Sequence, residues 1–150
     1  MMRTWRACTT VDGDPERVLE VLTDPEACAR WSPVRFDVED LEGDRLRTGS
    51  ALRLAGRLAG RTVGFDVRIL RADERRLALR ASGPVDIEAD YEVEPVDERT
   101  RLRASVSVHP GPGLTGRVLR GATDALLAGG ALEHAVARIA REAESLALAA

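Results

Sequence analysis

The sequence contains no lysine, asparagine or glutamine, and its 22 basic residues are all arginine. Its only cysteines are Cys8 and Cys28, too few and too far apart to indicate a zinc site or a disulfide framework. We therefore expect two reduced cysteines and no bound metal. No apolar run approaches the ~18 residues that a membrane-spanning helix needs, so the sequence does not predict a membrane-spanning protein.

The chain also lacks an excess of positive charge, because its formal net charge is −3 and acids alternate with bases along its length. Proteins that bind duplex nucleic acid usually carry a basic patch or a pI above ~9, so we expect no nucleic-acid partner. The stretch from Met1 to Arg6 has no apolar segment of the kind found in signal peptides. We expect a cytoplasmic protein.

The composition is otherwise that of a soluble globular protein, with 44% hydrophobic and 31% charged residues among 150. This length predicts a single domain over residues 1–150. Aromatic residues make up only 3%, so the core must consist mainly of leucine, valine and alanine. The sequence has no phosphate loop, nucleophile elbow or HExxH motif. We therefore expect no cofactor, and the sequence does not indicate an oligomeric state.

The first third of the chain predicts one strand followed by two short helices. Apolar and small residues alternate with polar ones from Met2 to Val11, as in a half-buried strand. Two Asp-Pro-Glu triplets follow, at 14–16 and 24–26. In each triplet Asp is a preferred helix cap, Pro suits the first helical position, and Glu favours the positive end of the helix dipole.

The middle of the chain, from Val34 to His109, has a period of two that predicts about six consecutive strands. Short turns separate these strands, so we expect an antiparallel meander. One face of the resulting sheet is almost wholly apolar. Its members are Val34, Phe36, Val38, Leu52, Leu54, Val63, Phe65, Val67, Ile69, Leu77, Leu79, Ile87, Ala89, Tyr91, Leu102, Ala104 and Val106.

The last part of the chain predicts a long amphipathic helix from Thr115 to Leu148, with a break at Gly129-Gly130 because glycine is costly inside a helix. Its apolar stripe is read at steps of three and four residues. The stripe consists of Val118, Ala122, Ala125, Gly129, Leu132, Val136, Ile139, Ala143 and Leu146. We expect Gly121 and Gly129 to leave space beneath the helix.

This order of elements, together with the segments 18–26 with Trp31, 49–54 and 60–63, resembles the START-like (SRPBCC) superfamily, which includes polyketide cyclases and lipid-transfer proteins. The resemblance implies an α+β helix-grip fold. In this fold a curved antiparallel sheet of about seven strands, two short helices and a long C-terminal helix enclose a hydrophobic cavity. The arginine-rich, lysine-free composition is typical of a GC-rich bacterial genome such as that of an actinomycete.

We therefore predict that the protein binds a hydrophobic small molecule, a polyketide-type natural product or a lipid, in this cavity. The predicted ligand-binding residues are Trp31, Phe36, Leu52, Leu54, Phe65, Val67, Leu79, Tyr91, Val106 and Leu132. For Trp31, ordinary core packing is the alternative to walling the cavity.

Two residues are candidates for catalysis, although the sequence carries no strong catalytic motif. Tyr91 is the only polar residue on the predicted inner face, where its hydroxyl would orient a ligand or act as an acid; a core tyrosine is the alternative. His109 lies at a predicted strand end beside the cavity mouth, where a general base would sit; a solvated histidine is the alternative. The resemblance implies that aromatase/cyclases of this superfamily use buried polar residues including arginine. Here every strand arginine falls on the outward register.

The segment Pro110-Gly111-Pro112-Gly113 supports a third hypothesis. Glycine lets another molecule approach the backbone closely, and its Cα–H is a good hydrogen-atom donor. Some START-like proteins of actinomycetes confer self-resistance to enediyne antibiotics by losing a hydrogen atom from a glycine and being cleaved. This resemblance implies Gly111 and Gly113 as candidate sacrificial residues; a plain strand-to-helix connection is the alternative. The three function classes are thus a binder, a cyclase and a sacrificial resistance protein.

Overall fold

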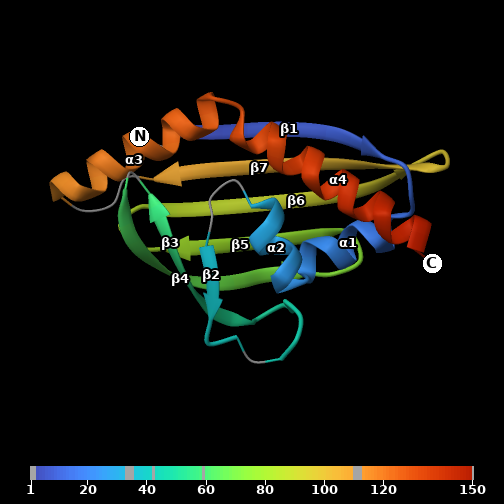
Figure 1. Cartoon of the computed structure of the whole chain (residues 1–150), viewed down its shortest axis with the longest axis horizontal. Coiled ribbons are helices and arrows are strands. Elements are labelled where there is room, and N and C mark those ends of the chain that lie inside the picture. The colour runs from blue at the N-terminus through green and yellow to red at the C-terminus, as the bar shows by residue number, and fades with distance from the viewer. Residues whose placement is uncertain (1–2, 33–35, 42, 59, 110–112, 150) are drawn as a thin grey trace.

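The computed structural model describes residues 3–32, 36–41, 43–58, 60–109 and 113–149. Within these ranges seven strands form one antiparallel sheet in the order β1-β7-β6-β5-β4-β3-β2 (Figure 1). The meander from β2 to β7 is confirmed, and β1 pairs with β7 at the other end of the sheet. Met2 and Val34, also predicted to lie in strands, are outside the described residues. The strands are β1 (Arg3–Val11), β2 (Phe36–Glu39), β3 (Ala51–Leu58), β4 (Arg61–Ala72), β5 (Arg76–Ser82), β6 (Asp86–Val96) and β7 (Arg99–His109).

Two short helices follow β1, and both begin at the predicted caps. They are α1 (Pro15–Thr23) and α2 (Pro25–Trp31). A carboxylate oxygen of Asp14 accepts a hydrogen bond from the backbone N–H of Arg17 at 3.1 Å. A carboxylate oxygen of Asp24 likewise accepts one from the N–H of Glu26 at 3.0 Å. Each cap satisfies an amide that has no partner within its helix, which fixes where that helix starts.

The C-terminal helical segment divides at Gly129-Gly130, as predicted, into α3 (Gly113–Ala128) and α4 (Ala131–Ala149). Gly130 has a φ of +95°, which glycine adopts without steric cost and which a right-handed helix cannot contain. Helix α4 packs against β1 and α1. All four helices of the described chain lie over the same face of the sheet (Figure 1).

The predicted apolar stripe is correct along most of α4 but wrong along α3. Val118 is 54% exposed and Ala125 is also exposed. The buried row of α3 is instead Gly116, Leu119, Thr123 and Leu127. Helix α3 carries two apolar rows, and the break at 129–130 resets the helical phase, so a stripe extended back from α4 follows the outer row. Gly121 is accordingly exposed, with open space where a Cβ would stand. The expectation that it leaves space between the helix and the sheet is therefore wrong.

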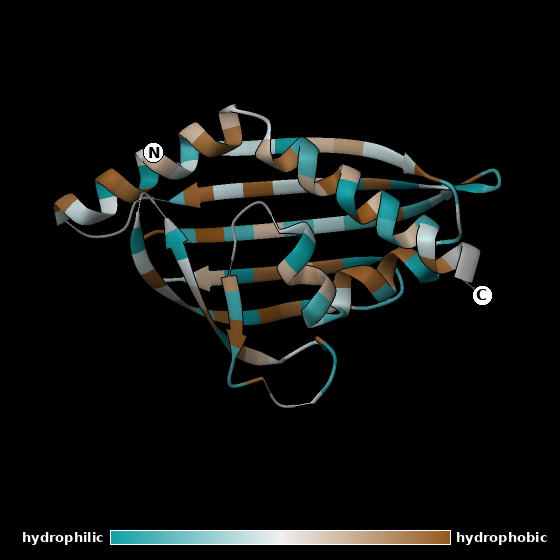
Figure 2. Ribbon diagram, in the orientation of Figure 1, coloured by the Kyte–Doolittle hydropathy of each residue, from teal (hydrophilic) through white to brown (hydrophobic). Residues whose placement is uncertain are grey.

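The core lies between the inner face of the sheet and the helices. Hydrophobic and hydrophilic residues alternate along the strands, as Figure 2 shows for β6 and β7. The inward side chains of Leu77 and Leu102 are fully buried, as is Ile139 of α4. The outer face carries cross-strand ion pairs such as Arg76 with Asp90. The sheet therefore has one apolar and one charged face, the arrangement predicted for an α+β protein.

Within the described ranges, no helix has both the length and the apolar character needed to cross a bilayer.

Candidate ligand-binding cavity

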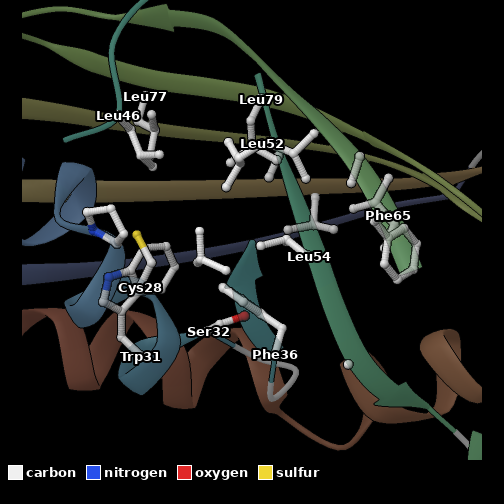
Figure 3. A pocket seen from close by; sticks show the side chains of 18 of the residues that line it. Cys28, Trp31, Ser32, Phe36, Leu46, Leu52, Leu54, Phe65, Leu77 and Leu79 are labelled. Carbon is white, nitrogen blue, oxygen red and sulfur yellow. The ribbon is translucent and has the colours of Figure 1, made fainter. Parts of the chain in front are cut away.

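An apolar cavity of about 150 Å³ lies between the inner face of the sheet and helices α2 and α3. Figure 3 shows Cys28 and Trp31 of α2 on one side of this cavity, with side chains of β3 and β4 on another. The lining residues are Pro25, Cys28, Trp31, Ser32, Phe36, Val38, Leu46, Leu52, Leu54, Gly56, Val63, Phe65, Val67, Ile69, Leu77, Leu79, Ala81, Ile87, Ala89, Tyr91, Val106, Thr123, Leu126 and Leu127.

Nine of the ten predicted ligand-binding residues line this one cavity. They are Trp31, Phe36, Leu52, Leu54, Phe65, Val67, Leu79, Tyr91 and Val106. The tenth, Leu132, is fully buried but belongs to the hydrophobic core rather than to the cavity wall. It lies at the start of α4, beyond the helix break, and α4 packs mainly over β1.

The wall that α3 provides was not predicted from the sequence. Thr123 and Leu127 belong to the buried row of α3 and line the cavity with Leu126. The outer row of α3, through Val118, has a helical spacing similar to that of the buried row, so the sequence pattern does not distinguish the two. Leu46 was also missed: it lies in the connection between β2 and β3, and its N–H donates to the carbonyl of Thr23 at 2.9 Å. Only the tertiary fold brings that connection to the cavity.

Gly83 allows the sheet to pack closely beside Phe65. A Cβ on Gly83 would lie 2.7 Å from the Cδ1 atom of Phe65 and 2.7 Å from the carbonyl oxygen of Gly64. Real Cβ atoms do not approach other atoms so closely, so any larger residue would displace this part of the wall.

Tyr91 and Trp31 form an aromatic pair at the cavity wall. Their ring centroids are 5.2 Å apart and the rings meet edge-on at 74°. The indole N–H of Trp31 donates to the carbonyl of Val21 at 3.1 Å, which holds the indole in place. Tyr91 is 3% exposed, and burial raises the pKa of its hydroxyl above the ordinary value. The phenol is therefore neutral at physiological pH and available as a hydrogen-bond donor.

Cys28 lies near this pair on α2 and also lines the cavity (Figure 3). Its thiol donates to the carbonyl of Leu22 at 3.1 Å. Burial, reinforced by the negative charge of Asp24, raises the pKa of Cys28. A nucleophilic cysteine needs the opposite shift. Cys8 is exposed on β1, and across the described ranges no group of three or more histidine, cysteine or acidic side chains is placed to hold a metal ion.

His109 does not line the cavity, so the position expected for it beside the cavity mouth is not observed. It pairs with Asp86 on β6, and its neighbour Val108 is fully buried on the inner face. Because successive strand residues point to opposite faces, His109 lies on the outer face of the sheet. Its Nε2 atom is buried without a hydrogen-bond partner among the described residues.

Of the two candidate sacrificial glycines, Gly113 is exposed at the start of α3, with a φ of +75°. A Cβ at this position would meet no atom of the described residues within 4 Å, apart from those of its chain neighbours and its own helix backbone. Gly113 is not part of the cavity wall. Gly111 lies outside the described residues.

A curved antiparallel sheet with helices on one face and an apolar cavity between the two layers defines a helix-grip protein of the START-like class. The chain belongs to the family described as polyketide cyclase/dehydrase and lipid transport, whose sequence model matches residues 2–144. No curated protein sequence matches the chain significantly.

Solved structures support the same fold. The Zhui aromatase/cyclase from Streptomyces sp. R1128 superposes with a TM-score of 0.76 at 24% identity, covering 96% of this chain and 94% of that one. A START superfamily protein from Mycobacterium smegmatis gives 0.66 at 21% identity, covering 95% and 98%. DynU16, described as a putative protein in the dynemicin biosynthetic locus, gives 0.60 at 23% identity, covering 94% of this chain and 47% of that one.

Proposed function

We propose that the protein binds a hydrophobic small molecule, of polyketide or lipid type, in the cavity beneath α2 and α3, without turning it over. The observation that carries this proposal is the composition of the cavity wall. The wall is apolar except for a few polar groups, of which Tyr91 alone has no hydrogen-bond partner among the described residues. Burying a ligand's apolar surface contributes about 25 cal/mol per Å², before the costs of association are subtracted.

The size of the cavity bears on the ligand that it accepts. A cavity of about 150 Å³ resembles engineered protein cavities that hold a single benzene ring. A larger polyketide therefore requires the walls to move apart. Helix α3 is the wall that we expect to move, because it joins α4 at the Gly129-Gly130 break and its lining residue Leu126 is already 38% exposed.

The absence of acid–base groups in the lining favours binding over cyclase activity. The lining contains no aspartate, glutamate, arginine or histidine among the residues that the structure describes. Its titratable side chains are Tyr91 and Cys28, and burial raises the pKa of both. General acid–base catalysis works best with a group whose pKa lies near the working pH. The likeness to an aromatase/cyclase is therefore one of fold, and the chemistry of this wall is that of a binder.

A second candidate function is sacrificial resistance to an enediyne. Gly113 is exposed and has open space beside its Cα, and the fold is like that of a protein from the dynemicin locus. In this candidate function an activated enediyne takes a hydrogen atom from the Cα of Gly113 or Gly111. The flanking amide groups stabilise the carbon radical that remains. Dissolved dioxygen, the oxidant in this step, adds to the radical carbon, and the backbone is cleaved oxidatively at that residue.

Mass spectrometry separates these functions. The protein is incubated with hydrophobic aromatic polyketides and, separately, with an enediyne plus thiol, and spectra are recorded under native and denaturing conditions. We expect an uncut chain and a polyketide that accompanies the native protein with unchanged mass. Release of a polyketide with altered mass would instead indicate that the protein is an enzyme.

Scission only with the activated enediyne would assign the sacrificial function instead. In that case Gly113→Ala should reduce the cut, whereas Gly121→Ala, at another exposed glycine of α3, should not.

A further inference from the structure

The described part of the cavity wall carries no formal charge. Among the residues that the structure describes, its lining includes no acidic or basic side chain, and the sequence contains no lysine. Two ion pairs of the neighbouring strands lie away from the cavity, on the outer face of the sheet: Arg76 pairs with Asp90, and Arg53 with Asp66. An anionic ligand group placed in the cavity would lose its hydration and meet no cation. An unpaired charge in an apolar interior is strongly disfavoured.

Most polar groups of the wall already have partners within the protein. The indole N–H of Trp31 donates to Val21, and the hydroxyl of Thr123 donates to the carbonyl of Leu119 at 2.8 Å. The thiol of Cys28 donates to Leu22, and Ser32 also has a partner. Among the described lining residues, Tyr91 is the one whose polar side-chain group has no partner within the described protein.

Tyr91 is fixed in orientation as well as unpaired. It lies in the middle of β6, between the paired residues Leu77 of β5 and Ala104 of β7. The edge-on contact with Trp31 restrains its ring from the helical side, and the carbonyl of Val21 on α1 holds the indole of Trp31 by accepting its hydrogen bond. The cavity therefore offers a single donor at a fixed point in an otherwise apolar space. This geometry suits a ligand with one acceptor oxygen. A further polar group on the ligand would gain no hydrogen bond from the wall.

We propose that the cavity selects uncharged ligands that carry a carbonyl acceptor for the Tyr91 hydroxyl, and that it rejects ligands of the same size that carry a carboxylate. Neutral aromatic ketones, esters and quinones belong to the accepted class. Free fatty acids and aromatic acids belong to the rejected class. This inference rests on the proposed binding function and narrows it to one kind of ligand.

Four single-ring probes of similar size test the inference by isothermal titration calorimetry at pH 7.5: acetophenone, methyl benzoate, benzoate and ethylbenzene. Acetophenone and methyl benzoate are neutral acceptors, benzoate is the charged counterpart, and ethylbenzene has no acceptor. We expect both neutral acceptors to bind at least about tenfold more tightly than benzoate, because benzoate must leave its charge unpaired. Esterification of benzoate should therefore restore binding.

Tyr91→Phe removes the hydroxyl and keeps the ring. In this variant we expect acetophenone to lose about 3- to 10-fold in affinity, the usual effect of one net hydrogen bond, whereas ethylbenzene should bind unchanged. An unchanged melting temperature for Tyr91→Phe would show that the wall is intact.

Benzoate that binds the natural protein as tightly as acetophenone would overturn the inference and leave the binding function standing. An equal loss of acetophenone and ethylbenzene in Tyr91→Phe would also overturn it, because the hydroxyl would then have no specific role. Failure of all four probes to bind would overturn the proposed binding function together with the inference.

Discussion

Tyr91 combines an inward orientation that the sequence predicts with burial and a raised pKa in the structure. Strand alternation predicts it to point inward, and the structure places it at the cavity wall against Trp31. Burial raises the pKa of Tyr91, and the nearby Cys28 raises it further, since a thiolate and a phenolate would repel each other. The position of this hydroxyl could be predicted from the sequence. That it has no partner could not, because this depends on which neighbours the fold brings within reach.

The raised pKa of Tyr91 predicts how the protein unfolds in alkali. In the unfolded chain tyrosine loses its proton near pH 10, whereas buried Tyr91 keeps its proton to higher pH. The contribution of Tyr91 to the free energy of unfolding is thus complete below about pH 10. It is lost as pH rises from there towards the pKa of the folded state, at up to about 1.4 kcal/mol per pH unit. Cys28, whose pKa is also raised, should begin the decline near its own unfolded pKa of about 8.5.

Tyr91 is the only tyrosine, so the near-ultraviolet absorbance of phenolate reports this residue alone. We expect the phenolate signal to appear together with the loss of secondary structure measured by circular dichroism. In Tyr91→Phe, the free energy of unfolding should fall less steeply above pH 10. A phenolate signal that rises near pH 10 while the fold remains intact would contradict the burial of this hydroxyl.

Among the elements, α2 connects a local sequence signal with the cavity. Its cap is Asp24, and it carries Cys28 and Trp31 to the wall. Helix α1, capped by Asp14, contributes no lining residue. The two capping residues are thus a matched pair for comparison, because only the helix capped by Asp24 carries residues that line the cavity.

Replacing either cap with alanine should reduce the free energy of unfolding by about 1 kcal/mol, the usual effect of losing an N-cap. Only Asp24→Ala should also weaken ligand binding, because it loosens the helix that carries Trp31 and Cys28 to the cavity wall. Urea unfolding measures the first effect and calorimetric titration with acetophenone the second. Equal ligand affinity in the Asp24→Ala and Asp14→Ala variants would refute a role for α2 in positioning the wall.

The strands and helices that could be predicted from the sequence are those with a clear hydrophobic periodicity. Strands with one buried face have a strict period of two, so β3 to β7 and their inward residues could be identified directly. Helix α3 could be located but not oriented, because its two apolar rows, one through Val118 and one through Leu119, have similar helical spacing. Only packing distinguishes them: Leu119 joins Val63 and Val85 in a separate buried cluster, while Val118 faces outward.

On the scale of the whole molecule, the cavity is the space that the sheet and helices leave between them. Strand alternation identified which sheet residues face it, because these share one face. It could not give the volume of the cavity or the contribution of Leu46, which depend on how the helices and connections pack. The outer placement of His109 follows from the same alternation, since its neighbour Val108 points inward. The expectation that His109 lies beside the cavity mouth depends only on its place at the end of a strand and does not take this alternation into account.

The most direct test of the account is whether filling the cavity abolishes binding. Ala89 on β6 lines the cavity, and Ala78 on the adjacent strand β5 pairs with Asp90 of the outer face. Phenylalanine at position 89 should occupy much of the available 150 Å³. The same residue at position 78 should leave the cavity unchanged.

Calorimetric titration with acetophenone should therefore detect binding by the natural protein and by Ala78→Phe, and a loss of at least about tenfold in Ala89→Phe, whose ligand must compete with the new ring for space. Melting curves establish that both variants are folded. Undiminished binding by a folded Ala89→Phe protein would contradict the account, because the ligand would then bind somewhere other than the cavity between the sheet and the helices.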